Sequence, residues 1–414
     1  MSKNVEVVVV GGGYGGVTAA NRLARRDGVS VTLVNRRADF VERIRLHQMV
    51  TGSDDAVEGF GEVLGGNVRL VVDAATRIDA AERRVSLAGG GTLTYDYLIY
   101  AVGSGAADPG VLGAAEFAYS VSDLEGAQRL RSALAAAPAT DPVTVVGAGP
   151  TGLETAAELA EGGRKVSLVC GDVLGPSLHA RVRRPVARRL AELGVTVIEG
   201  SQARVTEVTR DAVRLDDGRE VSSAVTIWTA GFRVPDLAAR SGLRTDTEGR
   251  LLTDATLTSV DDVRIVAAGD AAVMTDRPFR MSCQAAVQLG AGAAGTILRR
   301  IAGRTPGPVR LLFGGQCLSL GRDAGVTQFS YPDDRVNALH ISGRLGAGVK
   351  EFACRFTLKQ LASGARKAGA RTSQGGADSP EPGRPDHPTT PSGTRPTTPS
   401  GTRPTTPSGT RPAA

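Results

Sequence analysis

What this chain of 414 residues lacks excludes several classes of protein. Its four cysteines, Cys170, Cys283, Cys317 and Cys354, are far apart in the sequence, so a disulfide scaffold, a zinc site and a redox-active pair of adjacent cysteines have no support. We therefore predict no metal site and a reducing, cytoplasmic environment. No run of 18 apolar residues occurs, which argues against a transmembrane helix. The opening residues, MSKNVEVVVVGGG, enter a strand at once and lack the apolar region of a signal peptide.

Aromatic side chains and strong net charge are also scarce. Aromatic residues make up 4% of the sequence, and the formal net charge is +6. Residues 366–414 alone carry seven Lys or Arg and three Asp or Glu, so the rest of the chain is nearly neutral. A nearly neutral body with a basic tail forms no broad electrostatic surface for nucleic acid, and we predict no nucleic-acid partner.

Glycine, in contrast, is abundant, with 53 residues, and two glycine-rich turns share one pattern. The first, GGGYGG at 11–16, follows the apolar run VEVVVV, and the second, GAGPTG at 147–152, follows VTVV. Each precedes a segment with helical spacing. In a GxGxxG turn the first glycine makes the turn, the second admits a pyrophosphate to the backbone, and the third lets helix and strand pack closely. Two complete strand–turn–helix units predict two bound dinucleotides, FAD together with NADH or NADPH.

Apolar runs and helical spacing predict an α/β fold along the rest of the chain. Strands are expected at 29–34, 67–73, 84–87, 92–95, 97–101, 195–199, 225–229 and 263–267, and helices at 17–26, 123–136, 180–193 and 282–300. Residues 316–341 predict a small β-rich region. Residues 349–361 predict a short amphipathic helix whose apolar face carries Val349, Phe352, Ala353 and Phe356. From about residue 365 the sequence is polar and PTTPSGTR repeats three times in tandem, which predicts a disordered tail.

Four further segments have a recognisable order and spacing: YDYLIYAVGS at 95–104, IWTAGF at 227–232, RIVAAGDAAV at 264–273 and SCQAAVQLGAGAAGTI at 282–297. Together with the two turns, they make residues 4–300 resemble the pyridine nucleotide–disulfide oxidoreductase superfamily. The cysteine pair of the disulfide reductases is absent. The resemblance is therefore to the cysteine-free branch, the type II NADH:quinone dehydrogenases and the apoptosis-inducing-factor-like quinone reductases.

This resemblance implies an α/β fold with two Rossmann-like dinucleotide-binding domains, the NAD(P)H-binding one inserted in the FAD-binding one. The expected divisions are an FAD-binding domain at 1–118 and 236–305, an NAD(P)H-binding domain at 119–235, a small β-rich C-terminal domain at 306–364 and a disordered tail at 365–414.

The resemblance also implies which residues contact the cofactors. Asp270 is expected to approach the ribityl chain and pyrophosphate of FAD. Arg45 or His47 is expected to line the flavin region, although a purely structural role for His47 is an equal alternative. The full expected set is Gly11, Gly13, Tyr14, Gly15, Gly16, Asn35, Arg36, Arg45, Ala101, Gly103, Gly147, Gly149, Pro150, Thr151, Gly152, Gly231, Gly269, Asp270, Gln284 and Ala285.

Two positions after the nucleotide turns depart from the usual pattern. Asn35 stands where an acid commonly receives the adenosine ribose hydroxyls, but its amide still offers a donor and an acceptor. In the second unit this place falls on Cys170, and Asp172 follows two residues later. The choice between NADH and NADPH therefore stays open, with the resemblance favouring NADH.

Glu154 and Gln284 are the candidate catalytic residues. Glu154 lies two residues after the last glycine of the second turn, where a carboxylate ordinarily complements a helix N-terminus. The cysteine-free relatives carry GPTGxE here, and the resemblance implies that Glu154 reaches toward nicotinamide and flavin. Gln284 and Gln288 match the AQxAxQQG segment of the type II dehydrogenases, whereas Leu289 departs from it at the quinone contact. The alternative role for Gln284 is a helix-capping amide.

We predict an FAD-dependent NAD(P)H dehydrogenase that passes a hydride from NAD(P)H to FAD and electrons on to a quinone or a similar small acceptor. The alternatives are a ferredoxin-type protein reductase and a flavin-bound NADH sensor with little turnover. Because quinones dissolve in lipid, residues 349–367 are a candidate for peripheral contact with the inner face of the membrane. Alternatively, this helix packs over the β-rich region of the same chain. The oligomeric state stays open, a dimer included.

Overall fold

The first glycine turn lies at the carboxyl end of the central strand of a five-stranded parallel sheet. The computed structural model describes residues 4–276 and 279–369, all within one compact unit, Met1–Gln374. The strand order of this sheet is β21-β9-β1-β2-β5. Its strands are β1 (Val5–Val10), β2 (Val29–Asn35), β5 (Val68–Val72), β9 (Tyr97–Tyr100) and β21 (Ile265–Ala267). The valines of β1 alternate between two hydrophobic cores, because elements cover both faces of the sheet.

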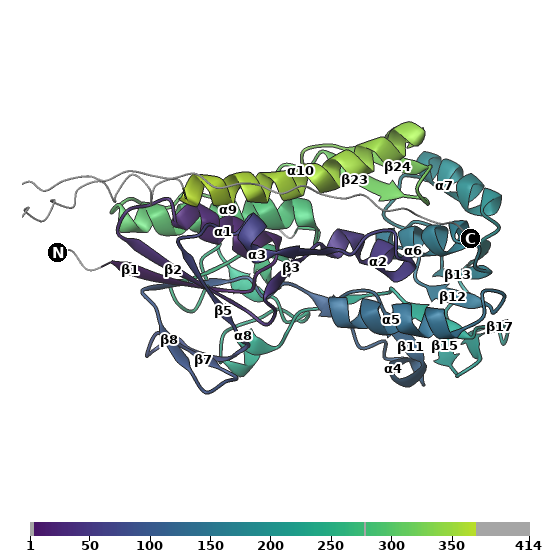
Figure 1. Cartoon of the computed structure of the whole chain (residues 1–414), viewed down its shortest axis with the longest axis horizontal. Coiled ribbons are helices and arrows are strands. Elements are labelled where there is room, and N and C mark those ends of the chain that lie inside the picture. The colour runs from purple at the N-terminus through teal and green to yellow at the C-terminus, as the bar shows by residue number, and fades with distance from the viewer. Residues whose placement is uncertain (1–3, 277–278, 370–414) are drawn as a thin grey trace, which may run out of the picture. The chain divides into compact units, whose positions relative to one another are not determined.

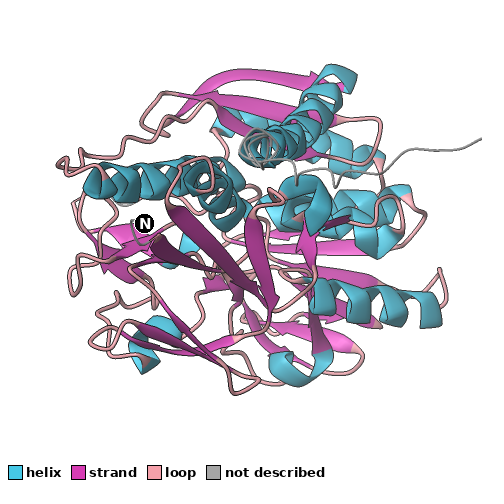
Figure 2. Cartoon of the chain, turned by 60° about the vertical axis from the view of Figure 1, so that its left-hand side comes forward, coloured by secondary structure: helices cyan, strands magenta, loops and turns pink. Residues whose placement is uncertain are grey.

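Three helices cover one face of this first sheet (Figure 1): α1 (Tyr14–Leu23), α9 (Cys283–Ile301) and α10 (Arg344–Gly369). Figure 2 shows the same layer from another side, with helices in cyan beside magenta strands. The opposite face carries β6 (Ala75–Asp79), β7 (Arg84–Leu87), β8 (Thr92–Thr94) and the short helix α8 (Leu237–Arg240).

The second glycine turn belongs to a second five-stranded parallel sheet of order β11-β18-β12-β13-β14. Its strands are β11 (Ala118–Ser120), β12 (Val143–Val146), β13 (Val166–Gly171), β14 (Thr196–Glu199) and β18 (Val225–Trp228). The accompanying elements are α4 (Ala114–Phe117), α5 (Leu124–Ala136), α6 (Pro150–Glu161), α7 (Ala180–Glu192), β15 (Val205–Val208), β16 (Ala212–Leu215) and β17 (Glu220–Ser222). The chain passes between the two sheets at β10 (Gly105–Ala106) and β19 (Phe232–Arg233), which pair antiparallel.

A third, antiparallel sheet precedes α10 and consists of β23 (Gly315–Ser319), β24 (Gly325–Ser330) and β25 (Val336–Gly343). The remaining elements are β3 (Asp39–Val41), η1 (Arg43–Arg45), α2 (Leu46–Thr51), β4 (Val57–Gly59), α3 (Phe60–Val63), β20 (Leu251–Thr253), η2 (Gly269–Ala271) and β22 (Ala272–Met274). The structure confirms the predicted α/β fold with two Rossmann-like cores. The domain divisions stay predictions.

The C-terminal helix differs from its prediction in length and in face. It has 26 residues, so its end extends past the expected start of the tail at 365. The helix packs against the β-rich region, but the expected apolar face is not the face that it buries, because Phe352 and Phe356 are 67% and 55% exposed. The buried residues are instead Gly346, Lys350, Cys354, Leu361, Ala365 and Ala368. The PTTPSGTR repeats lie outside the described residues. No helix within the described ranges has the length and hydropathy to cross a bilayer.

Candidate functional site

The first glycine turn has the geometry of a phosphate-binding turn. Gly11 has φ +107°, and a Cβ there would lie 2.2 Å from the carbonyl oxygen of Ala101. A Cβ at Gly16 would lie 1.8 Å from the Gly11 oxygen, so the strand and α1 touch directly. A Cβ at Gly13, in contrast, would meet no atom within 4 Å, and no side chain caps α1. The turn therefore leaves open space in front of backbone donors, which fits the pyrophosphate of FAD.

Two neighbours of this turn have roles that the pattern did not predict. Gly15 lies against α9, where a Cβ on Gly290 would come within 2.2 Å of the Gly15 oxygen. The Asn35 side chain accepts a hydrogen bond from the Gly12 N–H at 3.1 Å and donates one to the Arg37 carbonyl at 2.9 Å. Asn35 thus braces the turn, and its expected contact with the ribose stays a prediction. Arg36 is exposed.

Three segments converge where the first sheet ends. Asp270, in η2, accepts a hydrogen bond from the Ser104 hydroxyl at 2.7 Å, and the Arg43 guanidinium lies 3.8 Å from the same carboxylate. Gly103 and Gly269 have φ of +71° and +75°, which lets the backbone turn sharply on both sides of this cluster. The predicted residues Gly103, Gly269 and Asp270 are therefore brought together.

The second turn repeats the geometry of the first. Gly147 also has φ +107°, a Cβ at Gly152 would lie 1.8 Å from the Gly147 oxygen, and a Cβ at Gly149 would meet nothing within 4 Å. Pro150 occupies the first turn of α6, where its missing N–H costs nothing. The Thr151 carbonyl accepts a bond from the Thr155 hydroxyl. Gly231 has φ +81° beside the β10–β19 crossing.

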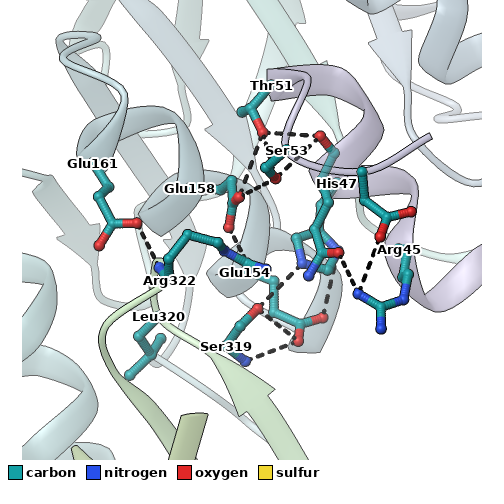
Figure 3. Close-up of polar contacts among 12 residues, drawn as sticks. Arg45, His47, Thr51, Ser53, Glu154, Glu158, Glu161, Ser319, Leu320 and Arg322 are labelled. Atoms are coloured by element: carbon teal, nitrogen blue, oxygen red, sulfur yellow. Dashed lines mark hydrogen bonds and ion pairs between the residues drawn. The ribbon is translucent and has the colours of Figure 1, made fainter. Parts of the chain in front are cut away.

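Glu154 is buried at the start of α6, and Figure 3 shows its contacts with Ser319 of the third sheet. An ion pair with Lys350 also connects Glu154 to α10. Its carboxylate accepts bonds from the Ser319 N–H at 3.0 Å, the Ser319 hydroxyl at 3.3 Å and the Lys350 ammonium at 2.9 Å. Burial is the largest influence on Glu154 and by itself would raise the pKa, but Lys350, His47 and the Ser319 N–H together outweigh it, so the pKa is lowered. Burial likewise opposes the charge of Lys350, yet Glu154 raises the pKa of Lys350. Both residues are therefore charged.

His47 completes this cluster as a neutral side chain. Its Nδ1 lies 4.0 Å from Glu154 and its Nε2 lies 3.2 Å from the Ser319 hydroxyl. Burial lowers the pKa of His47 to about 4, with Lys350 acting in the same direction and Glu154 opposing it. Glu158, one turn further along α6, bonds Ser53 at 2.6 Å and Arg322 at 2.6 Å.

The Arg45 side chain links three segments of the protein and is not free to contact a cofactor. Its guanidinium binds Glu42 at 2.8 Å, Gln48 at 2.9 Å and Glu351 at 3.0 Å, joining η1 and α2 to α10. Burial opposes its charge, but the bond to Glu351 raises the pKa of Arg45. One carboxylate oxygen of Glu42 and the hydroxyl of Tyr14 are buried without a hydrogen-bond partner in the described protein. Such orphaned groups fit a site that a ligand completes.

The N-terminus of α9 decides between the two roles considered for Gln284. The cap is Ser282, whose hydroxyl accepts a bond from the Ala285 N–H at 3.2 Å, so Gln284 is not a capping amide. The Gln284 side chain is exposed and makes no hydrogen bond among the described residues. Gln288, one turn later, holds the backbone of Leu312 through both its amide oxygen and its amide nitrogen at 2.9 Å. Leu289 is buried in the core.

The residues that sequence reasoning missed are Lys350, Ser319 and Glu42. Lys350 is the ion-pair partner of Glu154. Its only signal in the sequence was a lone lysine four residues before Cys354, on the helix face that the structure buries. The assumption that the phenylalanines define the apolar face concealed it. Within residues 4–276 and 279–369, no group of three or more His, Cys, Asp or Glu could hold a metal ion.

Residues 5–290 match the family model described as pyridine nucleotide-disulphide oxidoreductase. The chain belongs to this family. It is 33% identical over 308 residues to an NADH dehydrogenase-like protein of Mycobacterium tuberculosis, covering 67% of this chain and 76% of the relative. It is 31% identical over 347 residues to the type II NADH:quinone oxidoreductase Ndh of the same organism, covering 72% and 73%.

Solved structures share the fold. NDH2 of Plasmodium falciparum in complex with NADH superposes with a TM-score of 0.73 at 16% identity, covering 87% of this chain and 98% of that one. The sulfide:quinone oxidoreductase of Aquifex aeolicus superposes with a TM-score of 0.74 at 20% identity, covering 87% and 92%. Family membership confirms the predicted class, an FAD-dependent oxidoreductase that uses a pyridine nucleotide.

Proposed function

We propose that this protein oxidises NADH through FAD and passes the electrons to a quinone. The observation that carries the proposal is the buried Glu154–Lys350 pair, which places a charged acid and a charged amine between the second nucleotide turn and the C-terminal helix. Quinone reduction consumes protons as well as electrons, so a proton-handling pair has a use there that one-electron transfer to a ferredoxin lacks. The relatives named as NADH:quinone oxidoreductases support the same acceptor.

In this proposal the first turn holds FAD and the second holds NADH. The open space at Gly13 receives the FAD pyrophosphate, and Asp270 holds the adjoining chain with Ser104 fixing its carboxylate. When bound there, FAD would supply the hydride-accepting and electron-transferring chemistry between NADH and the acceptor. The open space at Gly149 receives the pyrophosphate of NADH.

Lys350 holds a proton at Nζ and Glu154 holds the negative charge that keeps it there. The Ser319 hydroxyl lies within hydrogen-bond reach of both Glu154 and His47. Because burial lowers the pKa of His47 to about 4, its ring is a neutral hydrogen-bonding partner in this cluster and does not take up a proton at neutral pH. Gln284 is placed to position the acceptor, because its amide is exposed in the first turn of α9 and is not used by the cap.

The carboxyl end of β13 supports NADH over NADPH as the donor. Asp172 is exposed there, and the Glu199 carboxylate at the end of the neighbouring strand accepts a bond from the Leu174 N–H at 2.7 Å. Carboxylates accept bonds from a ribose diol and repel a 2′-phosphate. The Arg183 guanidinium is engaged in hydrogen bonds to the carbonyls of Gly175 and Leu178.

The outer side of α10 suits peripheral contact with the inner face of the membrane. Leu345, Phe352 and Phe356 are 76%, 67% and 55% exposed, and the two phenylalanine rings stack with centroids 5.8 Å apart. Exposed aromatic and leucine side chains on a helix with basic residues bind the interface of an anionic bilayer. A Phe352→Ser, Phe356→Ser variant should remain folded and lose sedimentation with vesicles. Unchanged sedimentation would exclude this surface.

The acceptor is tested by steady-state kinetics on the purified, FAD-loaded protein. We expect rapid NADH oxidation with a short-chain, water-soluble quinone and slow oxidation with a ferredoxin. Saturation by the ferredoxin with poor quinone turnover would favour a protein reductase instead. A long-lived reduced state with either acceptor would favour an NADH sensor.

A further inference from the structure

An open surface cavity of about 390 Å³ lies along α1 and α9, and none of the residues that line it belongs to either glycine turn. Its floor is the later half of α9, and its far wall is the segment that follows that helix. The residues that line it are Arg22, Gln288, Ala291, Gly292, Gly295, Thr296, Arg299, Gly307, Pro308, Val309 and Arg310. None of these carries a carboxylate.

Glycine makes the hollow possible. A Cβ on Gly292 would lie 2.8 Å from a methyl carbon of Val309, so the far wall rests directly on the helix there. A Cβ on Gly295 would meet only the Arg22 guanidinium, at 3.9 Å. The space above Gly295 is therefore open and is bordered by a positive charge.

Three arginines surround this space, and they come from three separate segments. Arg22 stands in the last turn of α1, Arg299 in the last turn of α9, and Arg310 in the far wall. None of their guanidinium groups makes a hydrogen bond or an ion pair within the described residues. All three are exposed, and they differ from those arginines that pair with acids, such as Arg250 with Asp246 and Arg280 with Asp334.

Three unpaired guanidinium groups around one hollow raise the local positive potential and gather a counter-ion. Guanidinium binds phosphate oxygens through parallel N–H bonds and is the cation that proteins favour for this ligand. We infer that this cavity binds a phosphate group carried by a small ligand, at a site separate from both dinucleotide turns.

The surroundings suit either of two sources of that phosphate. The small apolar floor and the 65% exposed Leu312, two residues after Arg310, fit the glycerol and acyl part of an anionic phospholipid. The volume is near the lower end of ligand pockets, roughly 300–1,000 Å³, so a free phosphate metabolite of modest size also fits. The inference concerns binding alone and does not rest on the proposed electron transfer.

Isothermal titration calorimetry on the full-length, FAD-loaded protein tests the inference. The probes are inorganic phosphate and monomeric dihexanoyl phosphatidylglycerol, with dihexanoyl phosphatidylcholine as the zwitterionic control. Binding of the phosphatidylglycerol at least tenfold tighter than inorganic phosphate assigns the lipid source. Equal affinity for the two anions assigns the free phosphate source.

Two variants separate a built site from simple net charge. Replacing Arg22, Arg299 and Arg310 by Gln should weaken binding of both anions at least tenfold, whereas replacing the exposed Arg69, Arg77 and Arg204 by Gln removes the same charge and should change it less than twofold. Gly295→Leu keeps all three charges, fills the hollow and should also weaken binding about tenfold. Binding of neither anion to the native protein, or equal losses in the two triple variants, would overturn the inference.

Discussion

The two glycine turns have the same backbone and different surroundings. Gly11 and Gly147 share φ +107°, and Gly13 and Gly149 leave the same open space. At the next position the first turn carries Tyr14, which is 7% exposed and packs edge-on against Phe40, whereas the second carries the exposed Pro150. The first turn is enclosed by α9 and suits a resident cofactor; the second is accessible and suits a substrate that must leave after each turnover.

The helices that follow the turns differ in chemistry as well. The position two residues after the last glycine is Thr18 in α1 and Glu154 in α6. The Thr18 hydroxyl bonds back to the Tyr14 carbonyl at 2.7 Å and has no charge to offer. Glu154 reaches out of its own domain to Lys350 at 2.9 Å. The turn geometry thus specifies that a dinucleotide binds, and the neighbouring side chains specify what is done with it.

Removing the charge that distinguishes α6 from α1 should have the largest effect. We expect Glu154→Gln to retain FAD and to slow quinone-dependent turnover about a hundredfold, within the range of general acid–base contributions. Lys350→Met leaves a buried carboxylate without its partner and should cost about 3–5 kcal/mol of unfolding free energy.

The double variant Glu154→Gln, Lys350→Met is the matched control. It removes both charges and should be more stable than Lys350→Met alone, as measured by urea unfolding. Wild-type turnover in Glu154→Gln would show that Glu154 is only a helix-end charge. Glu154 would then contribute no more to turnover than Thr18, which holds the matching position in α1.

The stability of the fold should also depend on pH through His47, which belongs to the Glu154 cluster beside the second turn. The pKa of His47 is about 4 in the fold and near 6.5 when unfolded, so folding favours its neutral form. The stabilisation that comes from keeping His47 neutral is complete above pH 6.5 and is lost as the pH falls toward 4. The loss is on the order of 3 kcal/mol of unfolding free energy. Unfolding measured at a series of pH values should show this decline, and His47→Gln should flatten it. The same slope in both proteins would assign the decline to other groups.

Alanine substitutions at the two open glycines, Gly13 and Gly149, should separate FAD binding from NADH binding. Both positions have φ and ψ that alanine adopts without strain, and in both the added methyl would meet no described protein atom within 4 Å and would intrude on the space proposed for the pyrophosphate. Gly13→Ala should weaken FAD binding about tenfold, or about 1.4 kcal/mol, without changing the KM for NADH of the flavin-loaded fraction. Gly149→Ala should keep FAD and raise that KM about tenfold. A loss of flavin in Gly149→Ala would contradict the assignment of the turns.

The smallest effect is expected at the end of β13. Asp172→Ala removes an exposed carboxylate and should raise the KM for NADH about threefold, with kcat unchanged, since one exposed bond to the ribose contributes less than about 1 kcal/mol. The KM for NADPH should fall or stay constant. A larger rise for NADPH than for NADH would show that Asp172 does not contact the ribose.

The local patterns were sufficient to predict the parallel strands, both turns, the helix at 123–136 and the α/β fold, because each depends on neighbours in sequence. They were insufficient for Lys350, since its partner Glu154 is 196 positions away and the pairing depends on how α10 packs. They also did not show which face of α10 is buried, because Phe352 and Phe356 face outward while Cys354 and Leu361 face inward. Contacts of this range depend on the packed tertiary structure, which periodicity along one segment does not report.

The central claim, that one chain holds a resident flavin at one turn and exchanges NADH at the other, is tested most directly by an anaerobic titration followed in the visible spectrum. We predict one flavin per chain, bleaching of its band by one equivalent of NADH, and return of the band when a quinone is added. A purified, folded protein without flavin absorbance, or a flavin band that NADH leaves unchanged, would contradict it.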